Sequence, residues 1–126
     1  MKLKLSILEN HFTIHRFLPN HEIPNKIYKS EFYSISKTEE ELSVVCSSSI
    51  QLNSEKSEMD WSCIKVIGPL DFSLTGILAN ISVVLAEAKI SIFAISTFDT
   101  DYILIKSEKL LFAKKALLES GCIFEH

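Results

Sequence analysis

The chain has 126 residues, of which 47% are apolar and 23% charged, and its formal net charge is −3. This profile suits one ordinary globular domain or two very small ones, and it excludes a disordered chain. The negative charge argues against a general nucleic-acid binder, and the chain's 3 glycines cannot build the glycine-rich loops that bind nucleotides.

The first half of the chain, residues 1–60, is predicted to form strands with little helix. Four apolar or alternating runs indicate these strands, at residues 3–8, 12–18, 32–36 and 42–46. Residues 37–41 allow one helical turn at most. The polar, serine-rich segment 47–60 is predicted to be a connector to the second half.

The second half, residues 61–126, begins with Trp61, which is predicted to be a packing anchor, and a β-prone run at 62–67. From Leu74 onward the apolar residues change to helical spacing, and Ser73 or Asp71 can cap this helix. One stripe of the helix is apolar and consists of Ile77, Leu78, Ile81, Val84, Leu85 and Ala88.

The remainder of this half is predicted to be a hairpin, a second helix and a last strand. The hairpin strands are expected at 90–98 and 102–106, with a turn at 97–100. Ser107 is expected to cap the second helix and Gly121 to end it. With a last strand at 122–124, the order is β-α-β-β-α-β, which is the ferredoxin-like fold of the α+β class.

Cysteines and histidines offer no clear reactive or metal site. The cysteines lack C-x-x-C spacing and lie in apolar runs, so buried reduced thiols are expected at Cys46, Cys63 and Cys122. His11 and His15 fall on strand-like sequence about 13 Å apart, too far to share one tetrahedral ion. Solvated surface histidines are therefore favoured over zinc ligands, for His21 as well.

No enzyme site can be assigned from the sequence. There is no G-x-S-x-G elbow and no nucleophile–base pair, so the chain is predicted not to be an enzyme and to need no cofactor or metal. No run approaches the ~18 apolar residues of a membrane span, and no signal peptide is evident, which predicts a cytoplasmic protein. Glu125 and His126 could be native or the start of a tag.

Two segments of the second half could contribute to a ligand site. Residues 68–76, GPLDFSLTG, join a strand to a helix and are expected to place Gly76 inside the first helical turn. Close approach of a ligand or of another chain would explain this glycine, and a well-capped helix with an incidental glycine is the simpler alternative. In the hairpin, Asp101 begins a strand and could pair with a cationic group or be a solvated turn carboxylate.

Together these segments resemble the ACT domain, a small ligand-binding regulatory module of amino-acid metabolism. The resemblance rests on residues 68–78 and on residues 85–104, LAEAKISIFAISTFDTDYIL. Within this family, residues 61–124 look like the branch of aspartate-kinase regulatory regions and CASTOR-type arginine sensors. The resemblance implies two tandem ACT-like units with antiparallel sheets and helices on one face, at residues 1–60, with a reduced helix, and 61–126.

The resemblance also implies a ligand site between ACT units. Ligands of similar proteins lie against the first strand-to-helix loop and the turn between the second and third strands. The residues at these positions are Asp71, Phe72, Ser73, Leu74, Thr75, Gly76, Thr97, Phe98 and Asp101. A partner unit would supply the contacts to the ligand's α-carboxylate, from Ser43, Val44 and Val45. The arginine sensors carry an acidic residue where this sequence has Leu74, which argues for a more apolar or neutral ligand.

The resulting hypothesis is a regulatory protein, expected to be a homodimer, that senses an amino acid at an interface between ACT units. The alternative is a structural or interaction module that keeps the fold without a ligand. RNA binding is disfavoured, because the RNA-recognition motif of the same topology needs stacking aromatics and a basic sheet face. The inner strands here are aliphatic, at residues 64–67 and 103–105.

Overall fold

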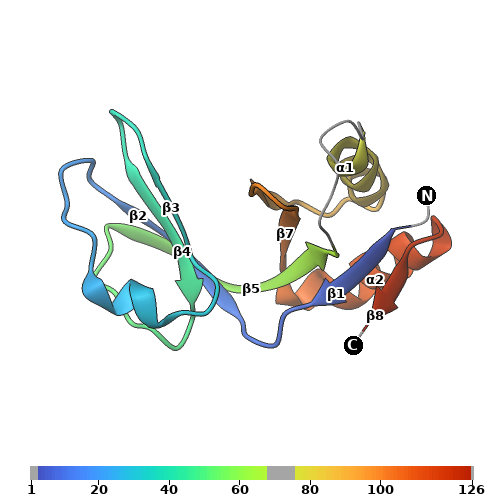
Figure 1. The fold of residues 1–126 in the computed structure, drawn as a ribbon, viewed down its shortest axis with the longest axis horizontal. Helices are drawn as coiled ribbons and strands as arrows, with labels where there is room; N and C mark the ends of the chain where they lie inside the picture. The colour runs from blue at the N-terminus through green and yellow to red at the C-terminus, as the bar shows by residue number, and fades with distance from the viewer. Residues whose placement is uncertain (1–2, 68–75, 126) are drawn as a thin grey trace. The chain divides into compact units, whose positions relative to one another are not determined.

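The computed structural model describes residues 3–67 and 76–125 of the chain. The chain divides into two compact units (Figure 1). Unit 1 contains Met1–Glu9 and Ser62–His126, and unit 2 contains the segment between them, Asn10–Trp61. The long strand β5 (Lys56–Val66) begins in unit 2 and ends in unit 1. Unit 1 is therefore discontinuous in sequence. The chain passes from unit 1 to unit 2 after Glu9 and returns after Trp61, and the predicted boundary near residue 60 marks only the return.

The sheet of unit 1 contains the C-terminal part of β5 and four further strands. They are β1 (Lys4–Ile7), β6 (Phe93–Ser96), β7 (Asp101–Lys106) and β8 (Ile123–Glu125). Strand β5 lies between β7 and β1, β6 is an antiparallel partner of β7, and β8 runs parallel to β1. Segment 3–8, predicted to belong to the N-terminal half, instead places β1 between β5 and β8. The physical reason is that Leu5 is fully buried in the core of unit 1.

Two helices complete unit 1 and confirm the predicted β-α-β-β-α-β order from β5 to β8. Helix α1 spans Ile77–Glu87, and α2 (Leu110–Glu119) follows a short 3-10 turn, η2 (Ser107–Lys109). The helices pack against each other over one core. The predicted stripe of α1 faces this core except for Ala88, which ends the helix and is exposed. The buried residues of the core are Leu5, Ile64, Val66, Ile81, Leu85, Ile90, Ile103, Ile105, Ala113, Leu117 and Cys122.

The helix ends follow the predictions only in part. Gly121 has a φ of +105°, in the region that favours glycine, and its N–H donates to the Leu118 carbonyl over 3.0 Å, as a C-terminal cap requires. The predicted cap Ser107 is instead the first residue of η2, and its hydroxyl lies 2.8 Å from that of Ser62. Ser107 therefore ties η2 to β5 and does not cap a helix.

Unit 2 contains three strands besides the N-terminal part of β5: β2 (Phe12–Phe17), β3 (Ser34–Lys37) and β4 (Leu42–Ser47). Strand β4 lies between β3 and β2, and β2 also pairs with β5, all antiparallel. The predicted strands of this half are confirmed within a few residues. The predicted connector 47–60 is partly wrong, because its residues from Lys56 onward pair with β2 as strand.

One face of the unit 2 sheet is covered by the 3-10 segment η1 (Asn25–Lys29) and by the loop after β4. Ile27 of η1 is fully buried, and Ile50 and Leu52 of the loop pack against the same core. The buried residues of this core are Phe17, Ile27, Leu42, Val44 and Cys46. A short 3-10 segment therefore does the covering that a full helix does in unit 1.

Candidate functional site

The hairpin turn between β6 and β7 carries the described part of the candidate site. The Thr97 N–H donates to the Thr100 carbonyl over 2.8 Å, and the Thr97 hydroxyl donates to the same carbonyl over 3.0 Å. The Thr100 N–H in turn donates to the Thr97 hydroxyl over 3.3 Å. These bonds close the predicted turn locally and leave Phe98 at its tip, with 81% of its surface exposed.

Asp101 lies directly across the hairpin from Ser96, at the first position of β7. The Ser96 hydroxyl donates to Asp101 Oδ1 over 2.6 Å, so the carboxylate is held in one orientation. Asp101 is half-buried. A carboxylate has about four acceptor positions, so a group oriented by one hydroxyl can still accept hydrogen bonds from an ammonium group of a ligand.

Thr100 positions this turn, a role that was not predicted from the sequence. Its side chain is buried, and its hydroxyl donates to the Val66 carbonyl over 2.5 Å. The hydroxyl therefore fixes the turn to the end of β5, where the chain enters the segment 68–75. A threonine in a turn is ordinary, and the sequence offered no signal that its hydroxyl would reach a strand 34 residues away.

Gly76 was predicted to lie inside the first helical turn of α1. In the structure it lies at the N-cap of α1, one residue before the helix begins. Its φ is +81°, a conformation that other residues rarely adopt, and its carbonyl accepts the Asn80 N–H over 2.7 Å. A Cβ at this position would meet Asn80 Nδ2 only at 3.9 Å, so space does not demand glycine. The backbone conformation explains this glycine. The site predictions at Asp71, Phe72, Ser73, Leu74 and Thr75 lie outside the described residues.

Strand β4 places the three unit 2 candidates in the middle of a sheet. Val44 is fully buried with its side chain in the unit 2 core, Val45 is buried as well, and Ser43 is half-buried. Strand β4 pairs with β2 on one side and with β3 on the other, so its backbone N–H and C=O groups at these positions form the hydrogen bonds of the sheet. Of the three, the Ser43 hydroxyl is the group best able to meet a ligand.

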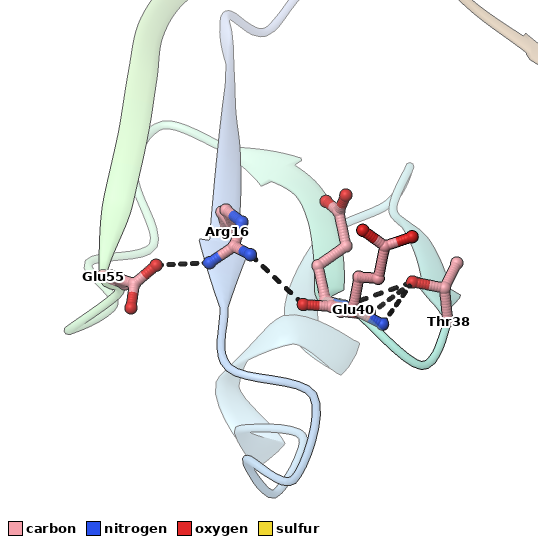
Figure 2. Close-up of polar contacts among 5 residues, drawn as sticks. Arg16, Thr38, Glu40 and Glu55 are labelled. Atoms are coloured by element: carbon pink, nitrogen blue, oxygen red, sulfur yellow. Dashed lines mark hydrogen bonds and ion pairs between the residues drawn. The ribbon is translucent and has the colours of Figure 1, made fainter.

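The acidic segment between β3 and β4 forms a closed turn (Figure 2). The Thr38 hydroxyl accepts the N–H groups of Glu40 and Glu41, each over 3.1 Å. Arg16 of β2 forms an ion pair with Glu55 and donates to the Glu40 carbonyl over 3.1 Å. These contacts engage the Arg16 guanidinium in the fold of unit 2.

One of the three histidines departs from its prediction. His15 is buried, whereas His11 and His21 are exposed as expected. Its Nδ1 lies 2.8 Å from the Ser54 hydroxyl, and within the described residues its buried Nε2 has no hydrogen-bond partner. Burial lowers the pKa of His15 below its usual value of 6.5. Its position opposite Val44 and Ser57 in the sheet explains this burial, which strand alternation alone did not settle.

The cysteine prediction is confirmed. Cys46, Cys63 and Cys122 are all buried free thiols. Burial raises the pKa of Cys63 to about 12, so this thiol is not a nucleophile near neutral pH. Over residues 3–67 and 76–125 no three metal-binding side chains come together, and no helix in that part of the chain is long and apolar enough to cross a membrane.

Two family profiles match the chain, one mainly within unit 1 and one within unit 2. The family profile described as the ACT domain matches residues 56–119, which contain β5, α1, the hairpin and all of α2. The chain belongs to the ACT domain family. A second profile, described as an N-terminal domain, matches residues 10–50, which lie within unit 2. A search of curated proteins gives no match.

Three solved structures each cover more than 90% of the chain. A protein from Agobacterium tumefaciens is 34% identical over 100% of this chain and 96% of its own, with a TM-score of 0.91. A Vibrio cholerae protein described as of unknown function and a possible transport protein is 20% identical, covering 94% of this chain and 90% of its own, with a TM-score of 0.72. The regulatory subunit of aspartate kinase from Thermus thermophilus is 11% identical, covering 91% and 95%, with a TM-score of 0.67.

Proposed function

We propose that this ACT protein binds an amino acid at an interface between ACT-like units and regulates a partner in the cytoplasm as a homodimer. Membership of the ACT family supports a regulatory, ligand-binding role, and the likeness to a regulatory subunit favours a non-catalytic domain. The observation that carries the proposal is the Asp101 carboxylate, held by Ser96 beside a turn that Thr100 fixes to β5. It provides one oriented negative charge for a ligand's ammonium group.

The regulatory mechanism is a shift between arrangements of the units. A ligand moves such an equilibrium only by its differential affinity for the two arrangements. The exposed aromatic ring of Phe98 lies three residues from Asp101 and would meet the apolar part of the same ligand. Leu74, where related arginine sensors carry an acidic residue, argues for a ligand with an apolar or neutral side chain rather than arginine.

RNA binding is disfavoured by composition, because the formal net charge is −3 and nucleic-acid recognition needs a basic surface.

A thermal-shift screen against the standard amino acids tests the proposal. A ligand at 100 times its dissociation constant stabilises the folded protein by about 2.7 kcal/mol. We expect a shift with a neutral or apolar amino acid and a smaller one with arginine. If no amino acid shifts the transition of a well-folded sample, the chain is instead a structural or interaction module with the ACT fold.

Substitution of one carboxylate in the hairpin identifies the binding group. Asp101→Asn removes the charge but keeps an oxygen that accepts from Ser96, and losing a charged hydrogen bond should weaken binding about tenfold or more. Asp99→Asn makes the same change two residues away in the same turn and should leave the affinity unchanged. Equal affinities of Asp101→Asn and the parent would reject this site while leaving amino-acid binding in place.

A further inference from the structure

The outer side of α2 carries large apolar side chains that unit 1 does not cover. Leu111 is 80% exposed, Phe112 is 63% exposed and Leu118 is 48% exposed, whereas Ala113 and Leu117 on the other side of the same helix are fully buried. Monomeric proteins rarely expose a contiguous apolar patch of this kind without a function. We call this the α2 surface, which consists of Glu108, Leu111, Phe112, Lys115 and Leu118.

A hollow of about 380 Å³ lies beside this surface, and Phe112 and Lys115 form part of its wall. The space is large enough to accept an apolar side chain from another molecule. Its lining is Ala88, Ile90, Lys109, Phe112, Lys115, Ala116 and Glu119. The α2 surface therefore offers both a projecting ring and a recess next to it, which is what a self-complementary contact needs.

The charges of the α2 surface are arranged for a second copy of the same surface. Glu108 and Lys115 are both exposed, and they flank Leu111 and Phe112 at equal sequence distances. A two-fold axis that passes beside the midpoint between Leu111 and Phe112 makes the α2 helices of the two copies antiparallel. It sets Glu108 of each copy opposite Lys115 of the other, with the apolar residues between them. A patch that presents both signs in this order complements itself better than it complements a uniformly charged partner.

We propose that unit 1 pairs with a second copy of this chain through the α2 surface, with Glu108–Lys115 contacts at both ends of a Leu111–Phe112 centre. This inference rests on the proposed homodimer and assigns it a surface. It places the contact on the helices, away from the hairpin turn that carries Asp101. Ligand binding and pairing are therefore separate properties that can be measured separately.

Charge reversal on the full-length chain tests the pairing. In a dimer of the Glu108→Lys variant, two lysines face each other at both ends of the contact. In a dimer of the Lys115→Glu variant, two glutamates face each other at both ends. Each variant alone should raise the dissociation constant of the dimer about tenfold or more, measured by sedimentation equilibrium. An equimolar mixture of the two variants restores both opposite-charge contacts, so a mixed dimer should form with an affinity within about threefold of the parent.

A matched apolar pair separates the surface from general effects on the helices. Phe112→Ser should weaken the dimer, whereas Val83→Ser, at an exposed position of α1 outside the α2 surface, should not. Circular dichroism checks that each variant is folded. A parent that is monomeric at all concentrations, single charge reversals that leave the dimer intact, or variants that fail to pair when mixed would each overturn the assignment. The amino-acid thermal shift should persist in every variant, and its presence or absence reports on the proposed amino-acid binding alone.

Discussion

His15 shows how burial of a single side chain couples the stability of unit 2 to pH. Its ring packs against Phe17, with 6.1 Å between centroids, and Phe17 in turn packs against His21 at 4.6 Å. The neutral ring can satisfy Nδ1 with the Ser54 hydroxyl, but a protonated ring would carry a charge in an apolar setting. The folded protein therefore resists protonation of His15 more than the unfolded chain does.

We predict that the free energy of unfolding falls as the pH drops from about 7.5, through 6.5, towards the lowered pKa of His15 in the folded protein. The unfolded chain binds a proton at His15 near its ordinary pKa, whereas the folded chain does not until the pH reaches the lowered pKa, so acid favours unfolding. The slope attributable to this group is at most about 1.4 kcal/mol per pH unit. Urea unfolding at several pH values measures it. His15→Phe should remove this component, and His11→Gln, at an exposed position, should retain it. An unchanged slope in His15→Phe would refute the assignment.

Residue-scale predictions succeeded where one local rule decided the outcome. Gly121 was predictable because many helices are followed by a glycine with a positive φ, and the cysteines were predictable from their apolar neighbours. Ser107 and Gly76 were misplaced by local rules. Ser107 found a partner in Ser62 that lies 45 residues away, and Gly76 adopts its conformation at the N-cap, one residue before α1 begins.

At the scale of elements, strand β5 joins sequence of two kinds. Its first residues, from Lys56 to Asp60, are exposed and mostly polar, and its last residues are mostly buried and apolar. Local propensity predicts a strand only for the second part, because charged residues are weak strand formers. Pairing of the first part with β2 decides the rest, with Lys56 opposite Arg16 and Ser57 opposite His15.

The β6–β7 hairpin depends in the same way on a contact outside itself. Because Ile67 donates to the Lys4 carbonyl on the β1 side of β5, the neighbouring Val66 carbonyl points to the opposite side, where the Thr100 hydroxyl donates to it. Thr100→Val keeps the shape of the side chain and removes this donor. We predict a loss of about 1–3 kcal/mol in the free energy of unfolding, because the buried carbonyl loses its partner.

Thr100→Ser is the matched control for this prediction, since it keeps the hydroxyl and removes one methyl group. Its loss should be smaller than that of Thr100→Val in the same urea titration. Hydrogen exchange of the amides at 97–101 should speed up in Thr100→Val if the turn detaches from β5. Equal stabilities of the two variants would mean that the hydroxyl contributes nothing to the hairpin.

At the scale of the whole molecule, the inserted strand β1 makes unit 1 dependent on the start of the chain. Leu5 is fully buried, and β1 pairs with both β5 and β8. A fragment of residues 56–126 contains the span matched by the ACT profile but lacks β1. We predict that it does not fold cooperatively, because a buried leucine alone contributes about 2–5 kcal/mol of a total that is typically 5–15 kcal/mol.

A shortened chain provides the control. The Leu8 N–H donates to the Cys63 carbonyl over 2.9 Å, so the ends of β1 and β5 lie side by side. Joining residues 1–8 to residues 63–126 through an Asn-Gly turn makes β1 and β5 a hairpin. This variant should show a cooperative thermal transition by circular dichroism. A cooperative transition in the fragment that lacks β1 would show that the inserted strand is dispensable.

The sequence by itself determined the β-α-β-β-α-β order from β5 to β8, the apolar stripe of α1 and the resemblance that led to the ACT family. These features depend on periodicity, turn residues and local motifs, which near neighbours in the chain specify. Only the tertiary structure decided that β1 completes unit 1, that His15 is buried and that Thr100 fixes the hairpin beside Asp101. Each of these depends on a contact between residues far apart in sequence. The energy of such a contact depends on both partners, so the local sequence around one of them does not predict it.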